Sequence, residues 1–231
     1  MLRQTIYSSL LAIGCLIAVY APTFALVSLL IVSGMLGHLN KSEAQLVAIP
    51  LVIIISTVIA LTIMALLARR RCLTLAAYGF KTTTSRHLAV ALGLGLFSAF
   101  GLRALGWILP IHESLDMGNL QKWQVILFLW ISAPIQEEIV FRGFLQSVVE
   151  MHCPVVMRMG NFKLPFAVFV SALLFAAVHI ATGRLGASLG QVMFIVFGAF
   201  VLGVLAGWLR WKSSSLLPAI LVHALFNILI G

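Results

Sequence analysis

Six polar residues of the kinds used in catalysis lie within apolar stretches of this sequence. They are Glu137, Glu138, Arg142, His179, His223 and Asn227. An ionised side chain at the centre of a bilayer costs at least about 2.5–3.5 kcal/mol on insertion scales, so such residues are functional candidates by default. Two carboxylates, two imidazoles, an amide and a guanidinium, drawn from three separate segments, predict one polar site inside a helical bundle, as in an intramembrane enzyme.

The acidic pair divides into two roles by its spacing from Arg142. On a helix, Glu138 and Arg142 are four residues apart and share a face, with the acid N-terminal to the base, which is the favoured orientation. Glu137 lies about 100° further around the helix and does not share this partner equally. We therefore expect a supporting Glu138–Arg142 ion pair and a reactive Glu137. The alternative for Glu137 is a buried acid hydrogen-bonded to a neighbouring helix.

The histidines and the asparagine indicate hydrolysis by one of two routes. A carboxylate beside an imidazole can activate water for attack on a peptide carbonyl. His223 and Asn227 lie on one helical face, where they would bind a developing oxyanion or hydrogen-bond a neighbouring helix. The other route is a metal site, because Glu137, His179 and His223 with a water suit zinc, although the sequence has no H-E-x-x-H. The cofactor is thus either none or zinc.

The composition indicates an integral membrane protein. Hydrophobic residues make up 62% of the 231 residues and charged residues 9%, against roughly 45–50% and about 25% in soluble domains. A span needs about 20 residues, so we expect a single all-α domain over residues 1–231, a polytopic bundle of about seven (six to eight) transmembrane helices. The net charge of +9 is expected to meet anionic lipid headgroups and not nucleic acid, because the basic residues gather at helix ends.

Seven apolar segments are expected to form these helices. Pro22 can bend or divide the first segment, so an eighth element is possible. The run that follows Arg3 passes through Leu36 without a small-residue cleavage site, and we expect a retained span rather than a removed leader. The seven segments are Ile6–Leu36, Ala44–Ala68, Leu88–Leu109, Trp123–Val149, Leu164–Thr182, Gly190–Trp208 and Ser215–Ile230.

Basic residues predict the orientation of the bundle, and segment lengths predict the depth of the site. The positive-inside rule assigns the basic loop between the second and third segments to the cytoplasm. Alternation of seven spans then places the N-terminus in the cytoplasm and the C-terminus outside, with ten basic residues inside and three, Lys41, Lys122 and Arg184, outside. Glu137, His179 and His223 fall about 21, 22 and 12 Å from the points where their segments enter the membrane. All three are expected near the middle of a core about 30 Å thick.

The order and spacing of the polar residues resemble those of a known family. Glu137–Gly143 is similar to the E-E-x-x-x-R motif of the CPBP family, the CAAX-protease and bacteriocin-processing (Abi) membrane proteins, which are related to the prenyl-protein CAAX endopeptidases. Phe175–His179 resembles the F-x-x-x-H motif of that family, His223–Asn227 its H-x-x-x-N motif, and Ser215–Ile220 its S-L-x-P-x-I lead-in. The resemblance covers residues 123–230, and the rest of the chain matches only as generic membrane sequence.

The resemblance implies an intramembrane endopeptidase that acts on a membrane-associated peptide, such as a prenylated CAAX-type protein, or on a small secreted peptide. It implies that Glu137 and His179 activate water, that His223 and Asn227 stabilise the oxyanion, and that Glu138 and Arg142 support the site. The family is described both as metalloproteases and as metal-independent glutamate proteases. We favour the second, because an amide and an arginine suit oxyanion and supporting roles better than ligation.

Two other functions are compatible with buried polar residues. Intramembrane Glu and His side chains also form proton relays, as in a proton-coupled transporter, although this sequence has no pair of similar halves. A non-catalytic immunity or scaffold member of the same family is the other alternative, but such a protein need not keep costly buried charge. The short chain without long extramembrane loops predicts a bacterial plasma membrane.

Overall fold

The computed structural model describes residues 2–33, 41–71, 73–109, 120–160, 162–181 and 187–230. The predicted segment ends at Leu36 and Thr182, together with Arg184, lie outside these residues, as does the side chain of Lys41. Within the described residues the chain is an all-α bundle with one short β-hairpin, which confirms the predicted fold class. A continuous helical stretch from Lys122 to His152 carries the acidic motif.

Each predicted apolar segment contains a helix. Among the described residues, five helices are long and apolar enough to cross a membrane, whereas α7 and α9 are apolar but shorter, so the number of spans stays a prediction. The first helix is continuous through Pro22, so that run is one element. The elements are α1 Leu2–Val32, α2 Lys41–Arg70, η1 Leu75–Tyr78, α3 Ser85–Ile108, α4 Lys122–Gln124, η2 Val125–Ser132, α5 Ala133–Glu138, η3 Ile139–Gln146, α6 Ser147–His152, β1 Val156–Met159, β2 Phe162–Pro165, α7 Phe166–Val178, α8 Leu189–Ser213 and α9 Leu217–Ile230.

The hairpin corrects one predicted boundary. The fifth segment was expected to begin at Leu164, but Leu164 and Pro165 belong to β2, which pairs antiparallel with β1, and the helix begins at Phe166. Proline favours an extended conformation for the residue before it and suits the position just ahead of a helix. The backbone N–H of Phe166 then donates to the carbonyl of Val155 at 2.9 Å, which ties the start of α7 to the hairpin.

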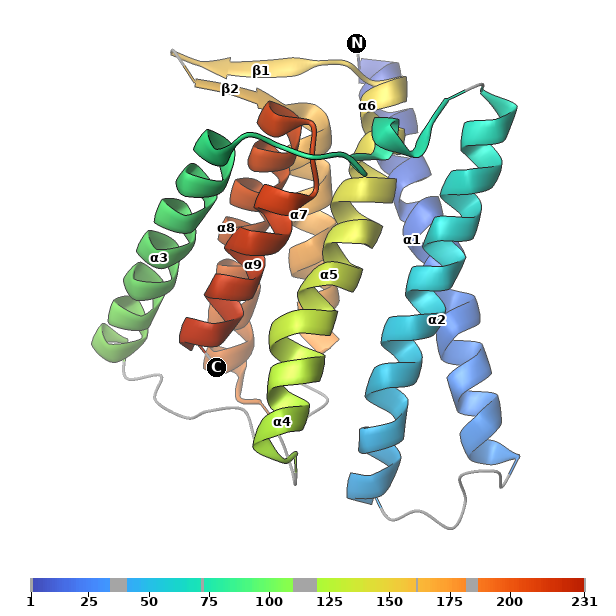
Figure 1. The fold of residues 1–231 in the computed structure, drawn as a ribbon, viewed down its shortest axis with the longest axis vertical. Helices are drawn as coiled ribbons and strands as arrows, with labels where there is room; N and C mark the ends of the chain where they lie inside the picture. Colours follow the sequence, from blue (N-terminus) through green and yellow to red (C-terminus); the bar gives the residue numbers. More distant parts are fainter. Residues whose placement is uncertain are drawn as a thin grey trace.

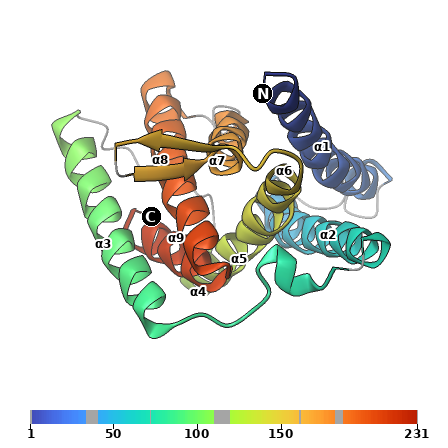
Figure 2. The same ribbon diagram turned by 90° about the horizontal axis from the view of Figure 1, so that it is seen from above.

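The helices surround the stretch that carries α5 and α6. Seen from above, α1 and α2 lie on one side of it and α3, α7, α8 and α9 on the other (Figure 2). Helix α9 contacts α3, α5 and α8, and α7 packs against α8 (Figure 1). The two termini lie at opposite ends of the bundle (Figure 1). Residues far apart in sequence on α5, α7 and α9 therefore meet around the middle of the molecule.

A stripe of small residues allows α8 to lie close to α7. A Cβ atom built on Gly203 would lie 2.9 Å from the Cα of Ala172, and one built on Gly207 would lie 2.9 Å from Cγ1 of Val168. The stripe therefore packs within the chain, by the close backbone approach that small residues permit in membrane proteins. The same approach brings α8 to the acidic motif, since the Gly203 position is 3.3 Å from Nη2 of Arg142.

Candidate active site

The acidic motif lies where the helix changes its winding. The six residues of α5 are flanked by two π-helical stretches, η2 and η3, in which backbone hydrogen bonds span five residues instead of four. At the first junction the N–H of Ala133 donates to the carbonyl of Phe128. Such wide turns are frequent at functional sites, and here Glu137 and Glu138 sit at the end of the α-helical turn between two of them.

Glu138 and Arg142 form a fully buried ion pair. Nη1 of Arg142 donates to Oε1 of Glu138 at 2.8 Å, and both side chains are 0% exposed. The predicted pairing is thus present. The guanidinium also lies over the face of Phe175, 4.4 Å from the ring centroid, where the electron-rich face attracts a cation. The carboxylate of Glu138 and the ring of Phe175 thus offset the cost of burying the positive charge of Arg142 in an apolar interior.

His223 joins the two carboxylates from α9. Its Nδ1–H donates to Oε1 of Glu138 at 2.8 Å, and its Nε2 lies 3.5 Å from Oε2 of Glu137. The Glu137 side chain is 24% exposed, whereas those of His223 and Glu138 are 3% and 0% exposed. Glu137 is therefore the more exposed carboxylate of the pair, and its contact with His223 was not expected; its reactive role stays a prediction.

The contact between Glu137 and His223 depends on the position of one further proton. Two carboxylates and one guanidinium leave one net negative charge in a site with little access to water. Because Nδ1 of His223 already donates to Glu138, a second proton must lie on Nε2 or on Glu137 for these two groups to attract each other. The separation of 3.5 Å is longer than a charge-assisted hydrogen bond of about 2.7–2.9 Å.

His179 lies at the C-terminal end of α7 and belongs to the same cluster through Phe175. Its Nδ1–H donates to the carbonyl of Phe175 at 2.8 Å. In a neutral imidazole this leaves Nε2 as the acceptor nitrogen. The Phe175 ring lies edge-on to the rings of both histidines, at centroid distances of 4.7 Å to His179 and 5.6 Å to His223. Phe175 therefore spaces two imidazoles and one guanidinium, a role that only the F-x-x-x-H motif signalled.

Asn227 hydrogen-bonds a carbonyl that the helix itself leaves free. Its Nδ2 donates to the carbonyl of Leu129 at 3.0 Å. Within the helix, the carbonyl of Leu129 would accept from the N–H of the residue four or five positions later. The N–H of Ala133, four positions later, donates to Phe128 instead, and Pro134, five positions later, has no N–H. The interhelical hydrogen bond that the sequence left as an alternative is thus present. It also fixes the amide, whose second N–H is available for an oxyanion.

A second polar network lies nearer the basic end of the bundle, and sequence patterns gave no sign of it. Nη2 of Arg210 donates to the carbonyl of Ala77 at 3.0 Å and to Oγ of Ser147 at 3.1 Å. Nε2 of Gln146 donates to Glu150 at 2.9 Å and to the carbonyl of Gly207 at 3.1 Å. Arg210 was counted among the basic residues facing the cytoplasm, yet it is only 4% exposed. It holds the η1 loop onto the bundle instead of meeting lipid.

The sequence left a metal site as the alternative to a metal-free reaction. Glu137, Glu138 and His223 lie together, but no group of three or more His, Cys, Asp or Glu side chains in the described part of the chain has an arrangement that could hold a metal ion. The donor atoms of His223 are directed to two carboxylates, and Nδ1 of His179 is bonded to a backbone carbonyl. Metal binding by Glu137, His179 and His223 thus stays a prediction.

Comparison with known proteins gives one match. Residues 119–229 match the family described as Type II CAAX prenyl endopeptidase Rce1-like. This range contains all six polar residues predicted to form the site, and it agrees with the resemblance found over residues 123–230. Searches of curated proteins and of solved structures gave no match.

Proposed function

We infer that the protein is an intramembrane endopeptidase, because residues 119–229 belong to the Rce1-like family of type II CAAX prenyl endopeptidases. The observation that supports this most directly is the partly exposed Glu137 beside His223. A carboxylate in contact with both an imidazole and the outside of the protein is what water activation requires. Glu138 and Arg142 hold this arrangement from below the surface.

We propose a reaction in which each of these side chains has the role expected for it. Glu137 takes a proton from a water molecule, and the water oxygen forms a bond to the peptide carbonyl carbon. His179, through Nε2, orients that water. The carbonyl oxygen becomes an oxyanion, which accepts hydrogen bonds from Nε2–H of His223 and from the second N–H of Asn227. The C–N bond then breaks, and the proton held by Glu137 passes to the leaving amine.

We propose a lipidated protein or membrane-associated peptide as the substrate, with prenylated CAAX-type proteins the first class to examine. The family description names prenyl substrates, and a polar site within apolar helices suits a peptide that a lipid brings to the membrane. We further propose a bacterial plasma membrane, with the N-terminus in the cytoplasm and the C-terminus outside. The basic residues at the N-terminal end of the bundle support this orientation.

A peptidase assay with Glu137→Gln tests the proposal. The purified protein is incubated with labelled prenylated and unprenylated peptides. Loss of a general base typically lowers the rate by about 10²–10⁴-fold, so we expect Glu137→Gln to cleave at least about 100-fold more slowly. Glu43→Gln is the matched control, because it makes the same substitution at an exposed position at the start of α2. Equal activity in the two variants would contradict the proposed role of Glu137.

The same assay separates the remaining alternatives. A strong chelator is expected to leave the cleavage rate unchanged, and a loss that zinc restores would show that the reaction is metal-dependent. Absence of cleavage of every peptide, with retained proton-dependent transport in liposomes, would support a transporter. Absence of both, with the protein still folded, would support a non-catalytic immunity or scaffold role.

A further inference from the structure

A pocket separate from the polar site opens between α1, α2 and the helix that carries η3 and α6. Its volume is about 360 Å³, within the range of about 300–1,000 Å³ typical of small-ligand sites. None of the six polar site residues lines it. The reaction proposed above therefore makes no use of this space.

The inner wall of the pocket is apolar. Leu11 and Ala18 line it from α1, Leu67 from α2, and Phe144 and Val148 from the central helix. Gly14 also lines it, and a Cβ atom built there would have nothing within 4 Å. The space beside α1 is therefore wide enough for additional carbon atoms, and its lining suits a hydrocarbon chain.

A held guanidinium lies among the polar lining residues. Nη2 of Arg71 lies 3.0 Å from Nε2 of His152, and Nη1 lies 3.7 Å from Sδ of Met151. His152 is fixed in turn, because its Nδ1–H donates to the carbonyl of Val148 at 2.8 Å, which leaves Nε2 to accept from Arg71. A guanidinium has five N–H donors, and these contacts engage two. The others are placed to bind an anion.

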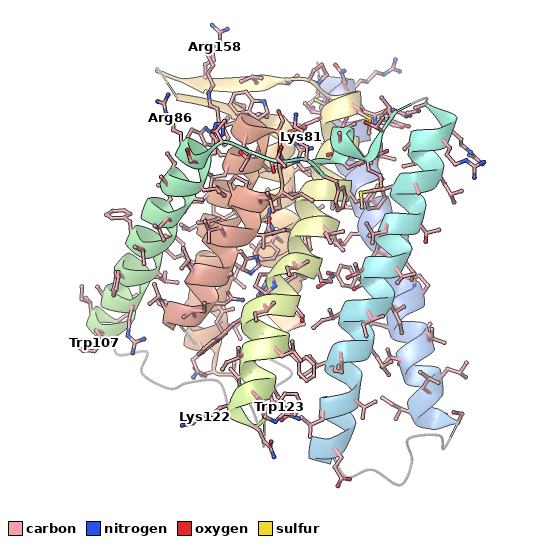
Figure 3. The ribbon with its side chains drawn as sticks, viewed as in Figure 1. Lys81, Arg86, Trp107, Lys122, Trp123 and Arg158 are labelled. Carbon is pink, nitrogen blue, oxygen red and sulfur yellow. The ribbon has the colours of Figure 1, made fainter. Side chains whose placement is uncertain are left out.

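The charge and position of Arg71 indicate the class of ligand. Arg69 and Arg70 precede it, and none of the described residues that line the pocket is acidic. Arg71 follows the last residue of α2 at the end of the bundle that also holds Lys81, Arg86 and Arg158 (Figure 3). Basic residues at this level meet anionic headgroups. The pocket thus combines an anion site at the membrane surface with an apolar interior.

We propose that this pocket binds one anionic glycerophospholipid of the surrounding bilayer. The phosphate accepts hydrogen bonds from Arg71, and one acyl chain enters the space beside Gly14 and Ala18. The lipid joins α1 and α2 to the central helix at their basic ends. This assignment is independent of the peptidase reaction and of its substrate.

Native mass spectrometry of the full-length protein tests the proposal. The protein, stripped of lipid in detergent, is titrated with phosphatidylglycerol or with phosphatidylcholine. We expect one equivalent of phosphatidylglycerol to bind, at least about tenfold more tightly than phosphatidylcholine. Arg71→Gln is expected to weaken this binding about tenfold, the effect of losing a charge-assisted hydrogen bond. Arg70→Gln, with the same loss of charge outside the pocket lining, should change it by less than about threefold.

A second pair of variants tests the apolar part without altering charge. Gly14→Leu fills the pocket and is expected to abolish binding of the one equivalent. Gly101→Leu makes the same substitution on α3, where a Cβ atom also has nothing within 4 Å, and should bind as the unaltered protein does. Both variants should unfold at the temperature of the unaltered protein, because each side chain enters open space.

Four results would overturn the assignment. Equal binding of the two lipids, or equal effects of Arg71→Gln and Arg70→Gln, would reduce the interaction to surface charge. Unchanged binding in Gly14→Leu would show that no acyl chain enters the pocket. Displacement of phosphatidylglycerol by a farnesylated peptide, itself lost in Gly14→Leu, would assign the pocket to a substrate instead.

Discussion

At the site, one oxygen of Glu138 accepts hydrogen bonds from two residues. Arg142 and His223 both reach Oε1 at 2.8 Å. Glu138 thereby fixes the position of His223, whose other ring nitrogen lies beside Glu137. Breaking a buried ion pair by removing one partner is strongly destabilising, because it leaves a charge uncompensated. We therefore propose that Glu138 is a positioning residue that supports the fold, and that the partly exposed Glu137 is the residue that reacts.

Asn227 has a structural partner, and this allows a test that separates structure from catalysis. Asn227→Ala leaves the carbonyl of Leu129 without its donor, at a cost of about 1–3 kcal/mol in unfolding free energy. Pro134→Ala supplies an N–H five residues after Leu129, which can replace that donor. We expect the double variant to recover about 1 kcal/mol relative to the sum of the single variants. Unfolding by sodium dodecyl sulfate in mixed micelles measures the unfolding free energy of the unaltered protein, the two single variants and the double variant.

The same four proteins test the oxyanion role of Asn227. Pro134→Ala restores a donor to Leu129 but none to the substrate, so peptidase activity should stay low in the double variant while stability returns. Additive changes in stability would show that the N–H introduced by Pro134→Ala does not replace the donor that Asn227 supplies to Leu129. Recovery of activity together with stability would show that Asn227 acts only through the fold.

Among the secondary-structure elements, the approach of α8 to α7 controls the surroundings of Arg142. A Cβ atom on Gly203 would lie 2.9 Å from backbone of Ala172 and 3.3 Å from Nη2 of Arg142. We expect Gly203→Ala to lower the unfolding free energy by about 1–3 kcal/mol, as overpacking typically does. It should also lower peptidase activity, since the guanidinium must shift. Gly190→Ala is the control on the same helix, because nothing lies within 4 Å of a Cβ atom there. Equal stability of the two variants would contradict the close packing of α8 against α7.

The features that depend on residue spacing along one helix could be predicted from the sequence. The apolar runs mark the helices, and the i, i+4 spacing of Glu138 and Arg142 gives their ion pair. Contacts between helices were harder to predict, because spacing does not fix the register of one helix against another. The contact of His223 with both carboxylates and the bond from Asn227 to Leu129 depend on the register of α9. The hairpin was missed because its strands are short and the end of β2, Leu164 and Pro165, merges with the apolar segment that follows.

For the molecule as a whole, the distribution of basic residues predicts which end faces the cytoplasm. Lys81, Arg86 and Arg158 lie at one end of the bundle, and Trp107, Lys122 and Trp123 lie at the other (Figure 3). Removing the buried Arg210 from the predicted ten leaves nine basic residues at the first end. Nine basic residues still outnumber the three predicted for the other side, so the positive-inside rule predicts that η1 and the hairpin face the cytoplasm.

Single cysteines introduced at Arg158 and at Lys122 in a cysteine-free background test this orientation. The two positions lie at opposite ends of the bundle (Figure 3), and Arg158 is exposed. A membrane-impermeant maleimide applied to intact cells should label Lys122→Cys and leave Arg158→Cys unlabelled until the membrane is permeabilised. The reverse pattern would show that the protein has the opposite orientation. Labelling of both cysteines from one side would require an even number of spans between Lys122 and Arg158. The expected pattern places the anionic phospholipid of the proposed pocket in the cytoplasmic leaflet, because Arg71 lies at the same end as Arg158.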